Sequence, residues 1–383
     1  MPGPVFSRKI PSEDGAAANL AAGKIAGKTA DKIAAQAEML ANRLRKRQRH
    51  LGKWARRTGA GAYRLYDRDI PEIPLVLDRY APVPSYAKDA DSAEGAAYIA
   101  GALYGRPYEK DGAEEAAWLE AMKNAAAASL AIPAENIFLR FRRRQRTGNP
   151  GQTGSAGAGS PGQVRGQYGR LAEKRVLCTI CEGGLSYRVN LSDYLDTGFF
   201  PDRRLLRARL RSEAARRRIL NLFCYTGSLS VAVAAGGAAS VDSVDLSAVY
   251  LAWARENAAL NGLEESRIRF IRADVLRFVE EALRQGRRWD TIILDPPAFS
   301  NSKKMAGHFD LKRDHAALIR RCLLLLEKGG TLYLSANVKG FRLDKEGIGS
   351  TMTDITETLR DEDMKGRRIP AAWKINVTET FFR

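Results

Sequence analysis

Three aspartates in the second half of the 383-residue chain each follow directly on a short apolar run. The runs span 240–245, 269–274 and 291–295, and they end at Asp245, Asp274 and Asp295. Separated by helical patterns, such runs predict parallel strands whose carboxyl ends meet at one rim of a sheet, where open α/β sheets bind ligands. Carboxylates at that rim can accept hydrogen bonds from ribose hydroxyls or from a nucleobase. For any single aspartate, the alternative role is to cap the helix that follows the strand.

The turn before the first of these aspartates narrows the choice of ligand. An apolar run at 219–224 is followed by a glycine and an Ala-rich helical pattern at 229–235, which predict a strand, a tight turn and a helix. A dinucleotide site needs the pattern G-x-G-x-x-G, whereas this turn has Phe223, Tyr225 and a single glycine, Gly227. A pyrophosphate therefore cannot approach the backbone closely. A smaller adenosine ligand without phosphates, such as S-adenosylmethionine, fits better and predicts methyl transfer.

Four segments of the sequence resemble one known family. They are Asn-Leu-Phe-Cys-Tyr-Thr-Gly-Ser at 221–228, Asp-Pro-Pro-Ala-Phe-Ser-Asn-Ser at 295–302, Tyr-Leu-Asp-Thr-Gly at 194–198 and Asn-Arg-Leu-Arg-Lys at 42–46. Each is similar to the guanine-N7 methyltransferase (K) half of the bifunctional 23S ribosomal RNA methyltransferases K/L, and the likeness runs from about residue 31 to the end. In that family this half follows a THUMP domain and a guanine-N2 methyltransferase, which this sequence does not contain. The resemblance therefore implies the N7 half standing alone.

The sequence pattern and the resemblance together predict a domain organisation. A class I, Rossmann-like α/β methyltransferase domain with a mostly parallel seven-stranded sheet is expected at 201–383. A smaller α+β RNA-binding domain is expected at 31–200, with a basic helix starting at Asp31 and a flexible Gly-rich loop at 147–169, after a flexible basic tail at 1–30. The pattern predicts further strands at 63–66, 74–80, 96–104, 136–142 and 330–337, helices at 114–130 and 205–218, a hairpin at 173–191, and an antiparallel pair from 354–359 and 373–381.

Strand-end geometry and the resemblance together suggest roles at the cofactor. Asp245 would hold the ribose hydroxyls, Asp274 with the backbone of Val275 the adenine amino group, and the turn 225–228 the methionine portion. Arg203 departs from the histidine or glutamine expected there, so we favour Arg204 over Arg203. The full set of expected cofactor-binding residues is Asn221, Phe223, Tyr225, Thr226, Gly227, Ser228, Asp245, Leu246, Asp274, Val275, Phe200 and Arg204.

The motif Asp295, Pro296, Pro297, Ala, Phe299 is the expected acceptor-base site. Amino-methylating enzymes use a similar turn, so Asp295 could accept hydrogen bonds from guanine N1 and N2 while Phe299 stacks on the flipped base. A rigid loop with a core phenylalanine is the structural alternative. Guanine N7 carries a free lone pair, so its methylation needs no general base, and positioning can supply most of the barrier reduction.

The charge of the chain points to a polyanionic partner. The formal net charge is +18, and 45% of the residues are hydrophobic, without any run near the roughly 18 apolar residues that span a membrane. Nucleic acid is therefore favoured over membrane, with 23S ribosomal RNA or the pre-ribosomal large subunit as the expected partner; a generally basic, solvated surface is the alternative. The expected RNA-binding residues are Arg43, Arg45, Lys46, Arg47, Arg140, Arg142, Arg143, Arg144 and Arg146.

Cysteines and histidines predict neither disulfides nor a metal site. Four cysteines in a chain of this size, with no signal-peptide pattern at the start, indicate a cytoplasmic protein. Cys178 and Cys181 form a C-x-x-C, but no second pair or histidine pair accompanies them.

Three other functions stay open at this stage. An RNA cytosine-C5 methyltransferase needs a nucleophilic cysteine, yet the matching segment 335–338 has none, and Cys322 lies among leucines. A guanine-N2 methyltransferase could use the same aspartate turn to bind an exocyclic amine. A non-catalytic RNA-binding ribosome assembly factor would have lost cofactor binding, so binding of S-adenosylmethionine separates it from the enzymes.

Overall fold

A computed structural model describes residues 13–83, 97–105, 111–142, 174–300, 309–345, 348 and 351–377, with side chains from residue 29 on. Arg143, Arg144, Arg146 and the expected Gly-rich loop at 147–169 lie outside the described residues.

A seven-stranded sheet forms the larger part of the molecule, in the order β14-β15-β13-β10-β7-β8-β9. Its five strands from β13 to β9 are parallel, and β15 and β14 close one edge in antiparallel pairing. The expected mostly parallel seven-stranded sheet is therefore confirmed. The strands are β7 (Arg218–Leu222), β8 (Ser240–Asp245), β9 (Ile268–Arg272), β10 (Trp289–Leu294), β13 (Leu326–Ala336), β14 (Thr351–Asp354) and β15 (Ala371–Asn376).

The order of the parallel strands reverses beside β7. The chain runs outward from β7 through β8 to β9 and then returns to the other side of β7 as β10. A reversal of this kind leaves a crevice at the carboxyl ends of the strands, which is where such sheets bind ligands. The helices that connect the strands are α4 (Ser228–Ala235), α5 (Ala248–Ala259), α6 (Val275–Arg284) and α7 (Leu311–Leu323), and a short pair, β11 (Phe299–Ser300) and β12 (Phe309–Asp310), follows β10.

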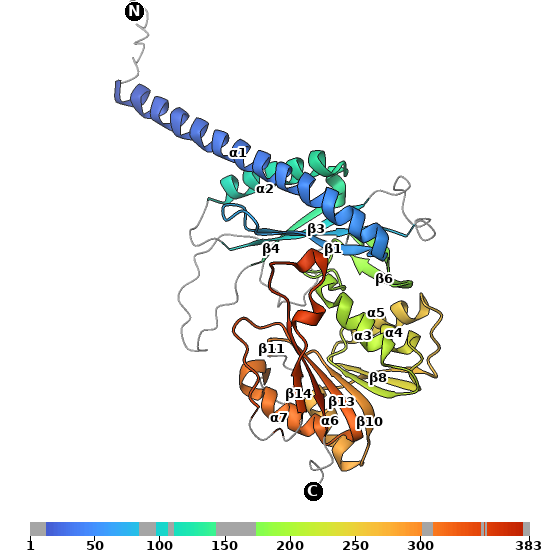
Figure 1. Ribbon diagram of the computed structural model, residues 1–383. Coiled ribbons are helices and arrows are strands. Elements are labelled where there is room, and N and C mark those ends of the chain that lie inside the picture. The colour runs from blue at the N-terminus through green and yellow to red at the C-terminus, as the bar shows by residue number, and fades with distance from the viewer. Residues whose placement is uncertain are drawn as a thin grey trace, which may run out of the picture.

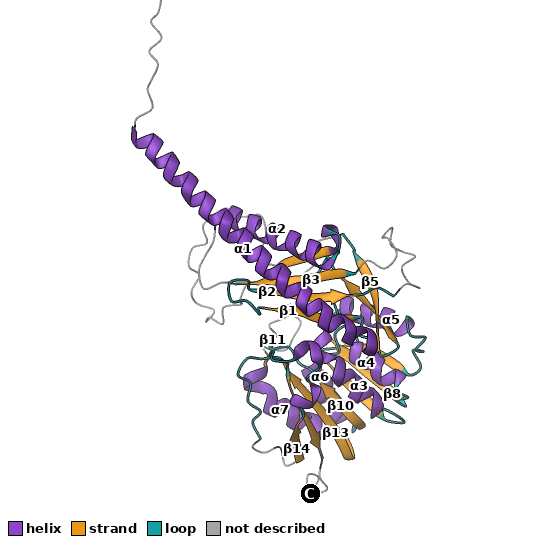
Figure 2. Cartoon of the chain, turned by 45° about the horizontal axis from the view of Figure 1, so that its top comes forward, coloured by secondary structure: helices purple, strands orange, loops and turns teal. Residues whose placement is uncertain are grey.

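The N-terminal part is a four-stranded sheet, β1-β2-β3-β4, with two helices on one side (Figure 1). Only the β3–β4 pair is parallel. The elements are α1 (Glu13–Thr58), β1 (Ala62–Asp67), β2 (Leu75–Tyr80), β3 (Tyr98–Tyr104), α2 (Gly112–Leu130), η2 (Ala134–Asn136) and β4 (Ile137–Arg142). Helix α1 extends well beyond the sheet (Figure 2). It begins at Glu13 instead of the expected Asp31, because its Ala-rich first half favours helix despite three glycines.

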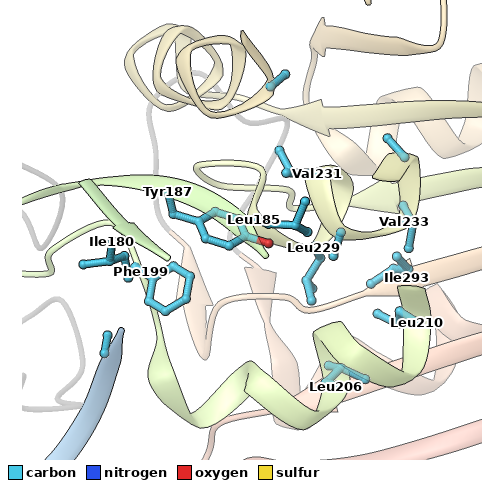
Figure 3. Packing of buried hydrophobic residues seen from close by; sticks show 14 of the residues in the cluster. Ile180, Leu185, Tyr187, Phe199, Leu206, Leu210, Leu229, Val231, Val233 and Ile293 are labelled. Atoms are coloured by element: carbon cyan, nitrogen blue, oxygen red, sulfur yellow. The ribbon is translucent and has the colours of Figure 1, made fainter. Parts of the chain in front are cut away.

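The hairpin of β5 (Leu177–Glu182) and β6 (Leu185–Asn190) joins the two parts. Tyr187 of β6 and Phe199 lie 5.0 Å apart between ring centres and pack in one buried cluster with Leu229 of α4 (Figure 3). The same cluster contains Tyr80 of the four-stranded sheet. Asn257 of α5 also accepts a hydrogen bond from the Arg188 backbone at 2.8 Å. The hairpin therefore packs on the seven-stranded half as well as on the N-terminal half.

Two segments differ from the expected boundaries. After η3 (Pro201–Arg203), helix α3 (Arg204–Ser212) ends six residues before the expected 218, because Arg218 already pairs in β7 and its N–H donates to Asp290 at 2.7 Å. Residues 357–359 form a 3₁₀ turn, η4 (Glu357–Leu359), with η5 (Glu362–Met364) after it, so the edge strand β14 stops at Asp354.

Candidate cofactor and acceptor site

Asp245 lies at the rim where the strand order reverses. Its Oδ2 accepts from the Tyr225 N–H at 3.0 Å and its Oδ1 from the Ser247 N–H at 2.9 Å. Burial raises the pKa of Asp245, although these backbone donors act in the opposite direction. Each carboxylate oxygen has a second lone pair, so the group is anchored and can still accept hydrogen bonds from a diol.

The turn after β7 is strained in a way that fits a ligand cradle. Phe223 and Tyr225 have φ of 59° and 53°, in the left-handed region that side chains rarely adopt, and Gly227 has φ of 74°. A Cβ on Gly227 would lie 2.7 Å from the Ala254 Cβ, so only glycine fits. The Thr226 hydroxyl donates to the Gly198 carbonyl at 2.6 Å, which fixes the turn against the preceding loop.

A buried hydrogen-bond network lies between β7, α4 and β8, next to the turn. The Asn221 Nδ2 donates to the Ser230 Oγ at 2.7 Å, and Ser243 Oγ donates to the same oxygen at 2.7 Å. All three residues are buried, and the Asn221 Oδ1 has no hydrogen-bond partner in the described part of the chain. An unpaired buried acceptor is costly, so its persistence is typical of a ligand-binding region.

Aromatic rings pack around Tyr225, whose backbone N–H binds Asp245. Tyr225 is 5.5 Å from Phe200 and 4.4 Å from Tyr250 between ring centres, and Phe200 is 39% exposed. This arrangement offers an apolar wall with one open ring.

Asp274 lies at the start of helix α6. The Asp274 Oδ1 accepts from the Leu276 N–H at 2.8 Å and so caps α6, whose first residue, Val275, is buried. The capping role considered as an alternative is therefore present. Leu246 follows Asp245 directly, and Ser228 is the first residue of α4.

Arg203, not the expected Arg204, holds the acceptor motif. The Arg203 Nε and Nη2 donate to the two oxygens of Asp295 at 3.0 and 2.8 Å. Burial opposes the charge of Arg203, but the charges of Asp295 and Asp202 outweigh it and raise the pKa of Arg203. Pro296 is buried, Pro297 is half-buried, and Phe299 is 43% exposed. The motif thus combines a fixed carboxylate with an aromatic ring that is partly exposed to solvent.

Comparisons with known proteins agree with this geometry. The family described as S-adenosylmethionine-dependent methyltransferase matches residues 131–346, more than half of the chain. The chain belongs to this family.

Two relatives and one solved structure extend the comparison. The ribosomal RNA large subunit methyltransferase K of Neisseria meningitidis is 40% identical over 336 residues, 88% of this chain and 86% of that protein. The K/L protein of Methylococcus capsulatus is 40% identical over 350 residues, 89% of this chain and 42% of that protein, so the chain spans less than half of it. The structure of SMU.776 complexed with SAH has the same fold, with a TM-score of 0.62 and 22% identity over 89% of this chain and 82% of that one.

S-adenosylmethionine is the cofactor of the methyltransferase, and the residues at the rim fit it. Asp245 can accept from a diol, Gly227 lets the turn pack closely against Ala254 of α5, and the Asn221 Oδ1 still lacks a partner in the described part of the chain. The assignment of each of these residues to a part of the cofactor remains a prediction.

Arg204 lies elsewhere in the methyltransferase. Its guanidinium contacts Glu182 at 3.1 Å, Asp361 at 2.9 Å and Asp363 at 3.3 Å, and it stacks 4.7 Å from the centre of the Trp54 ring. These contacts join α1, the hairpin and η5. The geometry therefore favours Arg203 over Arg204 as the neighbour of the acceptor motif. Sequence alone could not rank two adjacent arginines, because the start of α3 decides which one faces the rim.

Several expected RNA-binding arginines hold the methyltransferase itself together. Each of the following has an internal acceptor: Arg43 on Asp69 at 2.7 Å, Arg47 on the Asp363 carbonyl at 3.3 Å, Arg140 on the Leu191 carbonyl, and Arg142 on Asp196 at 3.3 Å. Arg45 and Lys46 are exposed, and Arg45 donates to Asn42 at 2.6 Å.

The cysteines of the methyltransferase are mostly buried. Burial raises the pKa of Cys178 and of Cys322 to about 12 and that of Cys224 well above its usual value, while Cys181 is half-buried. In the ranges that the structure describes, no group of three His, Cys, Asp or Glu side chains is placed to hold a metal. None of the described helices combines the length and apolar character needed to cross a membrane.

Proposed function

We propose that this enzyme methylates N7 of a guanine in large-subunit ribosomal RNA. Support for the RNA comes from the 40% identical relatives, whose names give the large ribosomal subunit as their target. Support for the base and atom comes from the acceptor motif and its resemblance to the N7 family. Ribosomal RNA as substrate would place the reaction in the cytoplasm.

The cofactor supplies an activated methyl group, and the rim would hold it through Asp245 and the turn around Gly227. Asp274 and Val275 are proposed to contact the adenine ring, although the Asp274 Oδ1 also caps α6. Phe200 and Tyr225 would exclude water from one side of the site. The role of the chain at this end is to orient the methyl group towards the acceptor base.

The acceptor base would lie between Asp295 and Phe299. Guanine donates hydrogens from N1 and N2, and the second lone pairs of the Asp295 oxygens can accept both while Arg203 holds the carboxylate in place. Phe299 offers its exposed ring for stacking. When one edge of guanine is held in this way, N7 lies on the opposite edge, open to the methyl group. Because N7 is buried in the major groove of paired RNA, the target base must be unpaired or flipped.

The observation that carries the proposal is the arginine fork on Asp295. Methylation of an exocyclic amine, as in a guanine-N2 enzyme, removes a proton from nitrogen and benefits from a carboxylate free to accept it. Each oxygen of Asp295 instead already accepts one hydrogen bond from Arg203, and the remaining lone pair of each is the one that would accept from guanine N1 or N2. N7 loses no proton, so a carboxylate that only positions the base is sufficient.

The cytosine-C5 alternative is weakened by the state of the thiols. Cys322 is fully buried with its pKa raised to about 12, and Ser335, in the segment where a nucleophile would stand, is also buried. Cys322 is therefore unsuited to act as a thiolate nucleophile, and position 335 carries no thiol.

The direct test is to identify the product. Large-subunit ribosomal RNA, made unmodified in vitro, would be incubated with the enzyme and methyl-labelled S-adenosylmethionine, then digested to nucleosides. We expect the label in 7-methylguanosine. Label in 5-methylcytidine or N2-methylguanosine would reject the assignment, and failure of the purified protein to bind S-adenosylmethionine in calorimetry would favour the assembly-factor alternative.

A further inference from the structure

A basic groove lies outside the cofactor and acceptor site, between α1 and η5. It is open to solvent, has a volume of about 620 Å³, and is lined by Lys46, Arg49, His50, Lys53, Trp54, Arg57 and Glu362. We call the four lysines and arginines in this set the groove cations. They are spaced by three or four residues along α1, which places them on one face of the helix over about 16 Å.

The groove cations differ from other arginines on the same helix. Arg43 and Arg47 have internal acceptors, as described above. Lys46, Arg49, Lys53 and Arg57 are all exposed, and none forms a hydrogen bond or ion pair with any residue that the structure describes. Their charges are therefore not used to stabilise the fold.

The single acid in the groove is already paired. Glu362 contacts His50 at 2.8 Å and Lys365 at 2.6 Å, and these neighbours lower its pKa, Lys365 most. Like charges that crowd one helix face repel one another, and a polyanion placed along that face would relieve the repulsion.

We propose that this groove binds the sugar–phosphate backbone of the RNA substrate, an inference that rests on the proposed function. A nucleic acid fits better than an acidic protein, because lysine is depleted at protein interfaces and common at phosphate contacts. The groove also lacks an apolar anchor for a protein partner. Its one aromatic residue, Trp54, is 5% exposed and has the Arg204 guanidinium over its ring.

The groove is connected to the acceptor motif through a series of ion pairs. Asp361 and Asp363, on either side of Glu362, bind Arg204, and the adjacent Arg203 holds Asp295. RNA gripped along α1 would thus be held on the same rigid framework that fixes the acceptor carboxylate. Such fixed placement is what an enzyme that works by positioning requires.

The test compares two variants with the same change in charge. In the first, Lys46, Arg49, Lys53 and Arg57 are all replaced by Gln. The control replaces by Gln four exposed cations at the amino end of the parallel strands, on the other side of the sheet from the rim that carries Asp245: Arg217, Arg267, Arg284 and Lys328. Binding of a labelled stem-loop of large-subunit ribosomal RNA is measured by fluorescence anisotropy at several KCl concentrations, and cofactor binding by calorimetry confirms that each variant is folded.

The groove variant should lose salt dependence as well as affinity. Each phosphate contact contributes about 0.7 to 0.9 to the slope of log K against log salt, so four lost contacts should reduce the slope by about 3 and the affinity on the order of 100-fold near 0.1 M salt. The control should keep a slope within about one unit of the wild type. Single changes Lys53→Gln and Arg57→Gln should each lower the slope by about 1, which keeps the test open if the fourfold variant does not fold.

Two outcomes would overturn the groove as an RNA site. One is an unchanged slope in the groove variant. The other is that the variant keeps RNA binding but loses binding of poly-L-glutamate, which would indicate an acidic protein partner. If instead the groove variant loses RNA binding as expected but the wild-type enzyme yields no 7-methylguanosine, the groove proposal stands and the proposed function fails.

Discussion

Replacing Arg203 should lower both the free energy of unfolding and the rate of methyl transfer. Arg203 is 8% exposed and donates two hydrogen bonds, at 3.0 and 2.8 Å, to a carboxylate whose side chain is 18% exposed. Removing one partner of such a pair leaves a largely buried charge uncompensated, which costs about 3 kcal/mol at this degree of burial. Arg203→Gln should therefore lower the free energy of unfolding by about 3 kcal/mol.

Urea unfolding of single and double variants isolates this interaction. With Asp295→Asn as the second change, the double-mutant cycle should give a coupling energy above about 1.5 kcal/mol. Arg209→Gln, on helix α3 directly after Arg203, is the matched control: the side chains of its ion pair with Glu213 are 32% and 39% exposed, so the change should cost less than about 1 kcal/mol.

Kinetics separate positioning from stability. Arg203→Lys keeps the charge but not the planar fork, so we expect part of the stability to return while turnover stays low and cofactor affinity stays normal. A coupling energy below about 0.5 kcal/mol, or full turnover in the folded Arg203→Lys variant, would refute the idea that this fork positions the acceptor carboxylate.

Three further predictions concern the cofactor, the base and the thiols. Asp245→Ala should weaken S-adenosylmethionine binding in calorimetry by about 2 to 4 kcal/mol. Burial raises the pKa of Asp245, so as the pH is lowered the wild-type affinity for the cofactor should begin to fall at a higher pH than it would with an ordinary aspartate, and Asp245→Asn should lack this pH dependence. Phe299→Ala should lower turnover by about 1 to 3 kcal/mol in transition-state terms while leaving cofactor binding intact; equal weakening of both would place the ring at the cofactor instead. A variant without any of the four cysteines, if it binds cofactor, should still methylate RNA, and a folded but inactive variant would point to a thiol nucleophile.

The parallel sheet and its rim were predictable because their signals are local. Apolar runs that stop at Asp245, Asp274 and Asp295 predicted the strands, and the reversal beside β7 brings their ends to one edge. The single glycine of the turn was also predictable, since Gly227 has a positive φ at a place where a Cβ would collide with Ala254.

The roles of individual arginines were not predictable in the same way. Arg203 and Arg204 are neighbours in sequence, and only the entry angle of α3 sends one to Asp295 and the other to Glu182, Asp361 and Asp363. Likewise the basic run on α1 contains internally bonded cations as well as cations without a partner among the described residues, because a helix turns Arg43 and Arg47 towards acids and carbonyls distant in sequence. The hydrogen-bond acceptors of these arginines are far away in sequence, so the local sequence pattern cannot predict them.

The central claim is that the methylated atom is N7, and the most direct measurement is chemical. Ribosomal RNA from cells lacking the gene would be methylated in vitro by the wild-type enzyme and treated with borohydride and aniline, which cleave at 7-methylguanosine. We predict one new cleavage at a guanine of the large-subunit RNA, absent without enzyme and absent with Asp295→Ala. Incorporation of labelled methyl groups without any new cleavage would contradict the assignment.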